Sequence, residues 1–274
     1  MNKLSTAKRV AVVAALVEGN SIRATARMTD VSKPTILKLL ADLGAVCTKY
    51  QDEALRGLNS RRIQIDEIWQ FCYAKDKNVP ADKIGTFGYG DVWTFVAIDA
   101  DSKLIPTWRV GSRDLATAYA VTHDLAARLK NRVQITTDGL KVYLESIESA
   151  FNEDVDYATL QKIYGSDPLA EKRYSPAKIL SSTTEIITGT PNPKHISTSY
   201  IERQNLTMRM SMRRFTRLTN AFSKKIENHA AAVALYTMHY NFARVHQTLR
   251  VTPAMQAGVA DHIWSLAEIV ALLG

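Results

Sequence analysis

The sequence predicts an α/β protein in which a mixed sheet is flanked by helices and preceded by a small all-α domain. Residues 5–43 show three short helical patterns with no strand pattern between them. From residue 61 onward, short runs rich in Ile, Val, Phe and Trp alternate with amphipathic stretches, as is typical of a sheet covered by helices. The chain has 274 residues, enough for one large or two modest domains.

The net charge of the chain indicates which kind of partner it is expected to bind. Lys and Arg number 35 against 27 Asp and Glu, which gives a net charge of +8 and favours nucleic acid over a membrane surface. Two cysteines exclude a disulfide framework and a four-cysteine zinc site. The apolar run Val10–Val17 is short for a signal peptide, and no stretch approaches the roughly 20 apolar residues of a membrane span. We therefore expect a cytoplasmic protein with no membrane partner.

The first three predicted helices have the plan of a helix-turn-helix. Ser5, Ser21 and Ser32 each precede a helical pattern at a position where the hydroxyl can cap the helix. The second helix of such a motif enters the DNA major groove, so the outward side chains of the third predicted helix are candidate DNA contacts. These side chains are Lys33, Thr35 and Lys38. The alternative is a small helical cap with a solvated basic face.

The domain boundary is predicted from a break in the helical pattern. The run Gly57–Ser60 interrupts it. We predict a helix-turn-helix DNA-binding domain at 1–50, a linker at 51–60, an α/β domain at 61–230 and a helical tail at 231–274. Residues from about 165 to 194 combine Pro and Gly with many Ser and Thr, which predicts a long mobile insertion within the α/β domain.

The predicted sheet begins with residues 61–73, an apolar run that contains Asp66 near its middle. An unpaired carboxylate in a buried strand costs on the order of several kcal/mol, so we expect a basic side chain or a metal ion to meet Asp66. The further strands that we predict are residues 91–100, 104–110 and 133–137. Residues 155–163 fit either a fifth strand or a partly helical segment.

Helices alternate with the later strands. The helices that we predict are residues 115–130, 140–151, 197–217, 224–240 and 262–273. A right-handed crossover would place strand 133–137 beside strand 61–73 and parallel to it. Asp66 and Asp138 would then meet near the carboxyl ends of adjacent parallel strands, where open α/β sheets bind ligands. Two close carboxylates repel each other unless a cation lies between them.

Each candidate acid has a structural alternative. A single Asp in an apolar strand is more often part of a salt bridge, Asp138 fits a turn, and Glu202 fits a helix capping box. Asp99, at the end of a predicted strand, competes with Asp138. Glu67 competes with Asp66 but should point to the opposite face of its strand.

A basic stretch follows Glu202. Between residues 203 and 225 there are seven cationic side chains and no acid: Arg203, Arg209, Arg213, Arg214, Arg217, Lys224 and Lys225. Such a row suits a phosphate backbone better than a solvated face, because like charges repel each other. Those predicted to bind DNA are Arg203, Arg209, Arg213 and Arg214.

Three motifs carry a family resemblance. IDEIW at residues 65–69, TTDGL at 136–140 and YIERQN at 200–205 resemble the signature of DDE transposases, which have a ribonuclease H-like core. The tail segments YNF at 240–242, HQTL at 246–249 and TPA at 252–254 resemble the C-terminal segment of insertion-sequence transposases, most closely the family of insertion sequence one. The resemblance covers nearly the whole chain, but the N-terminal zinc finger of some relatives is missing.

The resemblance implies a DNA transposase whose catalytic domain spans 61–230. Asp66, Asp138 and Glu202 would be the catalytic residues and would hold two Mg²⁺ ions, with Mn²⁺ as a substitute. The enzyme would bind the terminal inverted repeats of a transposable element, cut the 3′ ends and transfer them into target double-stranded DNA. It would act as a homodimer or larger homo-oligomer, associated with a prokaryotic nucleoid. The alternatives are a domesticated DNA-binding regulator and a structure-specific nuclease of the same fold.

Overall fold

The computed structural model describes residues 4–165, 179–216 and 220–274. Arg217 and much of the predicted mobile insertion lie outside these residues. No helix in the described part of the chain combines the length and apolar character that crossing a bilayer requires.

Three helices form the N-terminal part: α1 (Thr6–Val17), α2 (Ile22–Thr29) and α3 (Lys33–Ala54). The predicted caps are confirmed, because the hydroxyls of Ser5, Ser21 and Ser32 each accept a backbone N–H from the first turn of their helix. α3 continues well past the three-helix region that the sequence indicated, since its buried face extends through Leu43 and Cys47. That face packs against a helix that is distant in the sequence.

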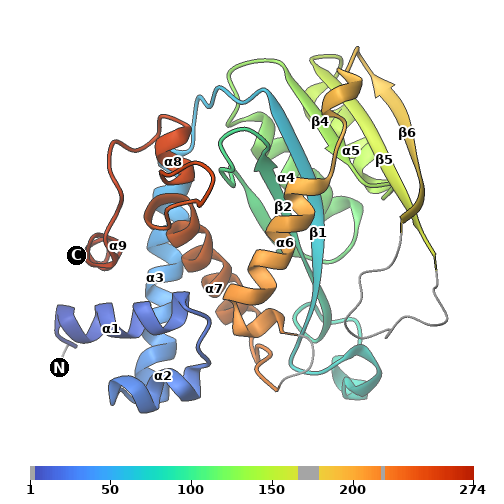
Figure 1. The fold of residues 1–274 in the computed structure, drawn as a ribbon. Helices are drawn as coiled ribbons and strands as arrows, with labels where there is room; N and C mark the ends of the chain where they lie inside the picture. The colour runs from blue at the N-terminus through green and yellow to red at the C-terminus, as the bar shows by residue number, and fades with distance from the viewer. Residues whose placement is uncertain (1–3, 166–178, 217–219) are drawn as a thin grey trace.

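A six-stranded sheet forms the middle of the protein, in the order β3-β2-β1-β4-β5-β6 (Figure 1). The strands are β1 (Arg62–Cys72), β2 (Gly90–Asp99), β3 (Trp108–Gly111), β4 (Val133–Thr137), β5 (Val155–Tyr164) and β6 (Ile179–Thr188). β1 pairs with β4 in parallel and with β2 in antiparallel orientation. β4 pairs with β5 in parallel, and β2 with β3 in antiparallel orientation. This mixed arrangement is that of a ribonuclease H-like core, as the sequence predicted.

Two strand predictions needed correction. The third strand is shorter than predicted and begins at Trp108. The side chain of Asn241 hydrogen-bonds both backbone groups of Ile105, accepting its N–H and donating to its carbonyl, so these groups do not pair with a neighbouring strand. Residues 179–188, predicted as part of a loop, form β6. Its central Ser and Thr residues are typical of a loop, but the segment pairs with β5 in antiparallel orientation and so forms a strand. The ambiguous segment 155–163 is strand β5.

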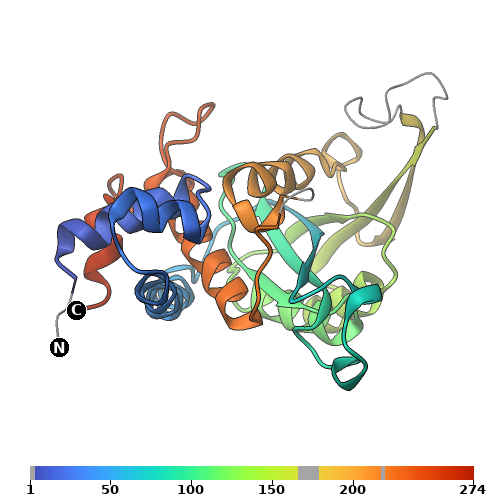
Figure 2. The ribbon, with the colours of Figure 1, turned by 90° about the horizontal axis from the view of Figure 1, so that it is seen from below.

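Helices cover both faces of the sheet (Figure 2). α4 (Leu115–Ala126) and α5 (Val142–Phe151) pack on one face around Ile65, Phe95 and Tyr143. α6 (Ser199–Ser211) and one side of α7 (Ile226–Met238) pack on the other face around Ile68 and Val96. α6 ends six residues before the predicted boundary at 217, because buried Met212 leaves the helix in an extended conformation and residues 213–215 form a single 3₁₀ turn.

The N-terminal and C-terminal helices share one apolar core. Leu40 and Leu43 of α3 pack in the same cluster as Ala234 of α7, Phe242 and Ile269. The remaining elements are the 3₁₀ turns η1 (Asp76–Asn78), η2 (Ala81–Lys83), η3 (Pro193–His195) and η4 (Arg213–Phe215), the π turn η5 (His239–Ala243), α8 (Pro253–Gln256) and α9 (Leu266–Ala271). The three N-terminal helices are therefore packed against the C-terminal helices, and the division of the chain into domains stays a prediction.

Candidate metal centre

Asp66 lies in the middle of β1, one residue past the last pair between β1 and β4, which joins Ile65 and Thr137. Its Oδ1 accepts the backbone N–H of Glu67 at 2.8 Å, and its Oδ2 accepts the side-chain amide of Asn205 at 2.8 Å. Neither donor carries a charge. Among the described residues no basic side chain pairs with Asp66, so of the two partners that we expected for it, a metal ion stays the prediction.

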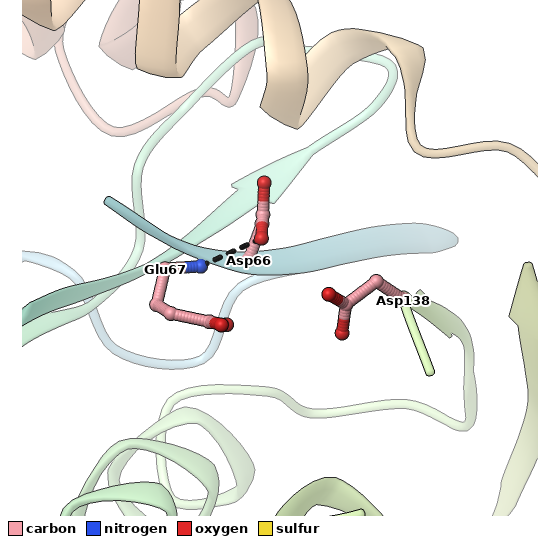
Figure 3. A group of neighbouring side chains, drawn as sticks. All are labelled: Asp66, Glu67 and Asp138. Atoms are coloured by element: carbon pink, nitrogen blue, oxygen red, sulfur yellow. Dashed lines mark hydrogen bonds between the residues drawn. The ribbon is translucent and has the colours of Figure 1, made fainter. Parts of the chain in front are cut away.

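Asp138 follows the last residue of β4, and its Oδ1 accepts the N–H of Leu140 at 2.9 Å, so it forms the turn that its position suggested. Its carboxylate also points toward β1 (Figure 3). Asp66, Glu67 and Asp138 each offer a carboxylate oxygen, and these three oxygens lie within 4.8 Å of one another. The expected approach of two acids at the ends of adjacent parallel strands is thus present, with a third acid beside them.

Glu67 is the acid that the sequence argument set aside. It points to the opposite face of β1 from Asp66, as expected (Figure 3). Its buried carboxylate accepts hydrogen bonds from Arg113 Nε at 2.8 Å and from the Tyr143 hydroxyl at 3.0 Å. Burial raises the pKa of Glu67, and the nearby charge of Asp138 raises it further, while Arg113 lowers it. Glu67 therefore has its own cationic partner, whereas Asp66 and Asp138 have none among the described residues.

The electrostatics of Asp66 are those of a carboxylate that lacks a counter-charge. Burial raises the pKa of Asp66 to about 7, and the negative charges of Glu67, Asp138 and Glu202 also raise it. The hydrogen bond from the Glu67 backbone opposes this effect. Hard carboxylate oxygens gathered in this way are the donors that Mg²⁺ and Mn²⁺ prefer. The residues at this position fit a divalent cation.

Glu202 lies in the first turn of α6, outside the group of acids within 4.8 Å. Its Oε1 accepts Lys162 Nζ at 2.5 Å and the Thr198 hydroxyl at 2.7 Å. Its charge nevertheless contributes to the raised pKa of Asp66. Its helix lies on the Asp66 face of the sheet, because Asn205 of α6 donates a hydrogen bond to the Asp66 carboxylate. The suggested capping box with Ser199 does not form, because the helix begins at Ser199 itself and Thr198 occupies the N-cap.

Two side chains that the sequence argument did not single out fix α6 over the acids. Gln64 Oε1 accepts the backbone N–H groups of Tyr200 and Ile201 at 2.9 and 3.0 Å, which holds the start of the helix on β1. Asn205, three residues after Glu202, reaches Asp66 from the same face of the helix. The spacing of Asn205 three residues after Glu202 could have indicated that both side chains lie on the same face of the helix. No pattern near Gln64 in the sequence indicates its contact with α6.

Asp99 does not compete for the site. Its Oδ1 accepts the backbone N–H groups of Asp101 and Ser102 at 2.7 and 3.2 Å, so it stabilises the turn after β2. Asp99 pairs with Ile63 near the start of β1, three residues before Asp66 along the strand. Its role is structural.

The predicted DNA-contacting side chains fall into two groups. Those on the surface are Lys33, Thr35, Lys38, Arg203 and Arg213. Arg209 instead turns inward, with its guanidinium near the Phe215 and Trp69 carbonyls at 3.3 and 3.5 Å. Arg214 donates to the Ser223 hydroxyl at 2.7 Å, and burial lowers its pKa to about 10. The predicted row of surface cations is therefore interrupted, because the chain bends after α6.

Comparisons with known proteins add a distant likeness. No protein-family model matches the chain, and no curated protein matches it. Among solved structures, it is similar to a piggyBac transposase in a synaptic complex with hairpin DNA, with a TM-score of 0.40 and 9% sequence identity over 98% of this chain and 69% of that one. A likeness of this degree leaves the family open, so membership of the insertion sequence one family stays a prediction.

Proposed function

We propose that this protein is a DNA transposase of the DDE type, which cuts and joins DNA by metal-dependent phosphoryl transfer. The observation that carries the proposal is the approach of Asp66 and Asp138 from adjacent parallel strands beneath the helix that carries Glu202. The net charge of +8 suits a polyanionic substrate. The motifs around the three acids are those that resemble the transposase signature.

The acids have distinct tasks in this proposal. Asp66 and Asp138 would hold a divalent cation, and Glu202 would join them after its ion pair with Lys162 opens. Asn205 fixes the outer oxygen of Asp66, and Glu67 stays bound to Arg113 on the other face of β1. A bound Mg²⁺ would polarise the phosphodiester and acidify the attacking water or 3′-hydroxyl. Mn²⁺ would substitute for it.

The helix-turn-helix is assigned to end recognition. Lys33 and Thr35 lie in the first turn of α3 and are exposed, and Lys38 follows one turn later, paired with Asp42 at 2.7 Å. An exposed i,i+4 pair contributes little to stability, so Lys38 can exchange Asp42 for a phosphate. In this proposal the α3 start contacts the terminal inverted repeats, and joining two ends requires a homodimer or larger assembly, in the nucleoid of a prokaryotic cytoplasm.

The test is an assay of cutting and joining on DNA that carries the ends of the element. Purified protein should nick the 3′ end with Mg²⁺ or Mn²⁺, should be inactive in EDTA, and should transfer the exposed end into a second duplex. Cutting without transfer would indicate a nuclease of the same fold. Specific binding without any nicking would indicate a domesticated regulator, and either result would refute the proposed activity.

The raised pKa of Asp66 predicts how a metal ion changes stability. The pKa rises from 3.8 to about 7 on folding, so the folded protein holds this proton more tightly than the unfolded chain does. Without metal, stability from this group is therefore greatest below about pH 4, falls between pH 4 and 7, and stays low above pH 7. Since a cation binds the ionised form, we expect the rise in melting temperature caused by Mg²⁺ to increase from pH 5 to pH 8.

Asp66→Asn supplies the matched comparison. At pH 8 without metal this variant should be more stable than the wild type, by at most about 4 kcal/mol for three pKa units, and Mg²⁺ should no longer raise its melting temperature. Asp82→Asn, at an exposed position in η2, should behave as the wild type. An equal effect of Mg²⁺ on the wild type and on Asp66→Asn would remove Asp66 from the metal site.

A further inference from the structure

A large cavity lies where the N-terminal helices meet the end of α6. Its volume is about 820 Å³, and it is lined by residues of α1, α2 and α3 on one side and by residues 211–214, 220–224 and one side of α7 on the other. Gly19, in the turn between α1 and α2, approaches the carbonyl of Ser211 so closely that a Cβ at Gly19 would lie 3.0 Å from that oxygen. The cavity, called here the interhelical cavity, therefore joins the helix-turn-helix directly to the helix that carries Glu202.

The interhelical cavity is strongly cationic. Among the described residues it is lined by five basic side chains and no acidic one: Arg23, Lys33, Arg213, Arg214 and Lys224. Within the described ranges, none of the five forms an ion pair with an acid, whereas Lys38, Arg56 and Arg62 each do. α2 and α3 also begin at this wall, and their N-termini add partial positive charge. Five cations around one hollow repel each other unless an anion enters it.

The length of α6 between Glu202 and the interhelical cavity suits a continuous DNA strand. Ser211 lies nine residues after Glu202 on α6, which corresponds to roughly 14 Å along the helix axis. One DNA strand carries a phosphate about every 3.4 Å along the duplex axis. A strand with its reactive phosphate at the acids would therefore present a phosphate about four nucleotides away at the interhelical cavity.

We propose that the interhelical cavity is a second DNA site, which takes the phosphodiester backbone of the bound strand about four nucleotides from the bond cut at the metal centre. This inference rests on the proposed function. Arg23 of α2 and Lys224 of the segment before α7 contact the phosphates from the two walls, and half-buried Arg214 adds a further positive charge between them. The site would link end recognition to cutting, because one wall belongs to the N-terminal helices and the other to the segments that follow the Glu202 helix.

The test compares two matched double variants in salt titrations of DNA binding, in EDTA so that no cutting occurs. The cavity variant is Arg23→Gln with Lys224→Gln, and the control is Lys49→Gln with Lys77→Gln, which removes two exposed cations elsewhere. We expect the cavity variant to bind the end DNA at least about tenfold more weakly, with a slope of log K against log salt lowered by up to about two. The control should keep the wild-type slope.

A scan of the DNA locates the contact. Replacing one phosphate at a time by an uncharged methylphosphonate should weaken wild-type binding at a position about four nucleotides from the cut, and this loss should be absent in the cavity variant. The proposal is overturned if no position shows such a difference, or if the cavity variant and the control have equal slopes. Wild-type protein that binds ends without nicking them refutes the enzyme but leaves the cavity proposal standing.

A small anion is the alternative occupant. Inorganic phosphate and a deoxynucleoside monophosphate should raise the melting temperature of the wild type and of the cavity variant equally, because the contacts require a strand. A rise confined to the wild type, together with equal salt slopes for DNA, would show that the cavity binds a small phosphate ester and would overturn the assignment to DNA.

Discussion

Asp66→Ala should abolish metal-dependent strand cleavage, with a fall in the single-turnover nicking rate of at least about 10³-fold. The Asp66 carboxylate is proposed to hold the metal ion, and alanine offers no oxygen that could take its place. A 10³-fold fall in rate corresponds to the loss of about 4 kcal/mol of transition-state stabilisation. Asp138→Ala and Glu202→Ala should each have the same effect. End binding, measured in EDTA, should remain within a few fold of the wild type because the N-terminal helices that we propose bind the DNA ends are unchanged.

Glu67→Gln is the internal control for this result. A carboxylate oxygen of Glu67 lies within 4.8 Å of one from Asp66 and one from Asp138. However, the Glu67 carboxylate accepts hydrogen bonds from Arg113 and Tyr143 on the other face of β1. It acts on the site through its neighbours, so we expect a loss of only about 10- to 100-fold. Wild-type nicking by Asp66→Ala, with complete inactivity of Glu67→Gln, would place the reactive centre on the opposite face of the sheet.

Gly44→Ala should lower the free energy of unfolding by about 3 kcal/mol. Gly44 lies within α3 against α7, and a Cβ at this position would lie 2.5 Å from the Cβ of Ala231 and 2.6 Å from its Cα. The two helices would have to separate and disturb the core that the N-terminal and C-terminal helices share. The sign is informative, because Gly→Ala in a helix normally stabilises it by roughly 1 kcal/mol.

The unfolding measurement can be made with chemical denaturant. The double variant Gly44→Ala with Ala231→Gly should recover part of the loss, since the Cβ contact disappears while the contact with the Cα of residue 231 remains. Gly57→Ala is the comparison, because nothing lies within 4 Å of its added Cβ and only its backbone φ of +62° is strained. A Gly44→Ala protein as stable as the wild type would show that α3 and α7 can separate without cost.

Local sequence signals and one chirality rule determined much of the fold. The three serine caps, β1, β4 and the helices after them follow from side chains within a few residues of each other. The right-handed crossover makes β1 and β4 parallel neighbours, which brings Asp66 and Asp138 together. These predictions succeeded because each depends on a short stretch of chain or on a nearly invariant handedness.

The errors arose where a distant partner decides the outcome. β6 exists through its pairing with β5, β3 begins late because Asn241 holds Ile105, and α3 continues because α7 covers its face. Hydrogen bonds and burial supplied from far along the chain leave little trace in local periodicity. The sequence alone therefore showed these segments as a loop, a longer strand and a shorter helix.

The sequence by itself determined which acids this protein carries at the ends of its strands and on its helix, and the excess of cations beside them. Only the tertiary structure decided which partner each charged side chain contacts. In it, Glu202 forms an ion pair with Lys162, and Glu67 forms one with Arg113. Arg214 donates to the Ser223 hydroxyl, and Asp66 accepts hydrogen bonds from uncharged donors. The physical reason is that the energy of a charge depends on its burial and on neighbours within a few ångströms, and these neighbours come from segments that the sequence keeps far apart.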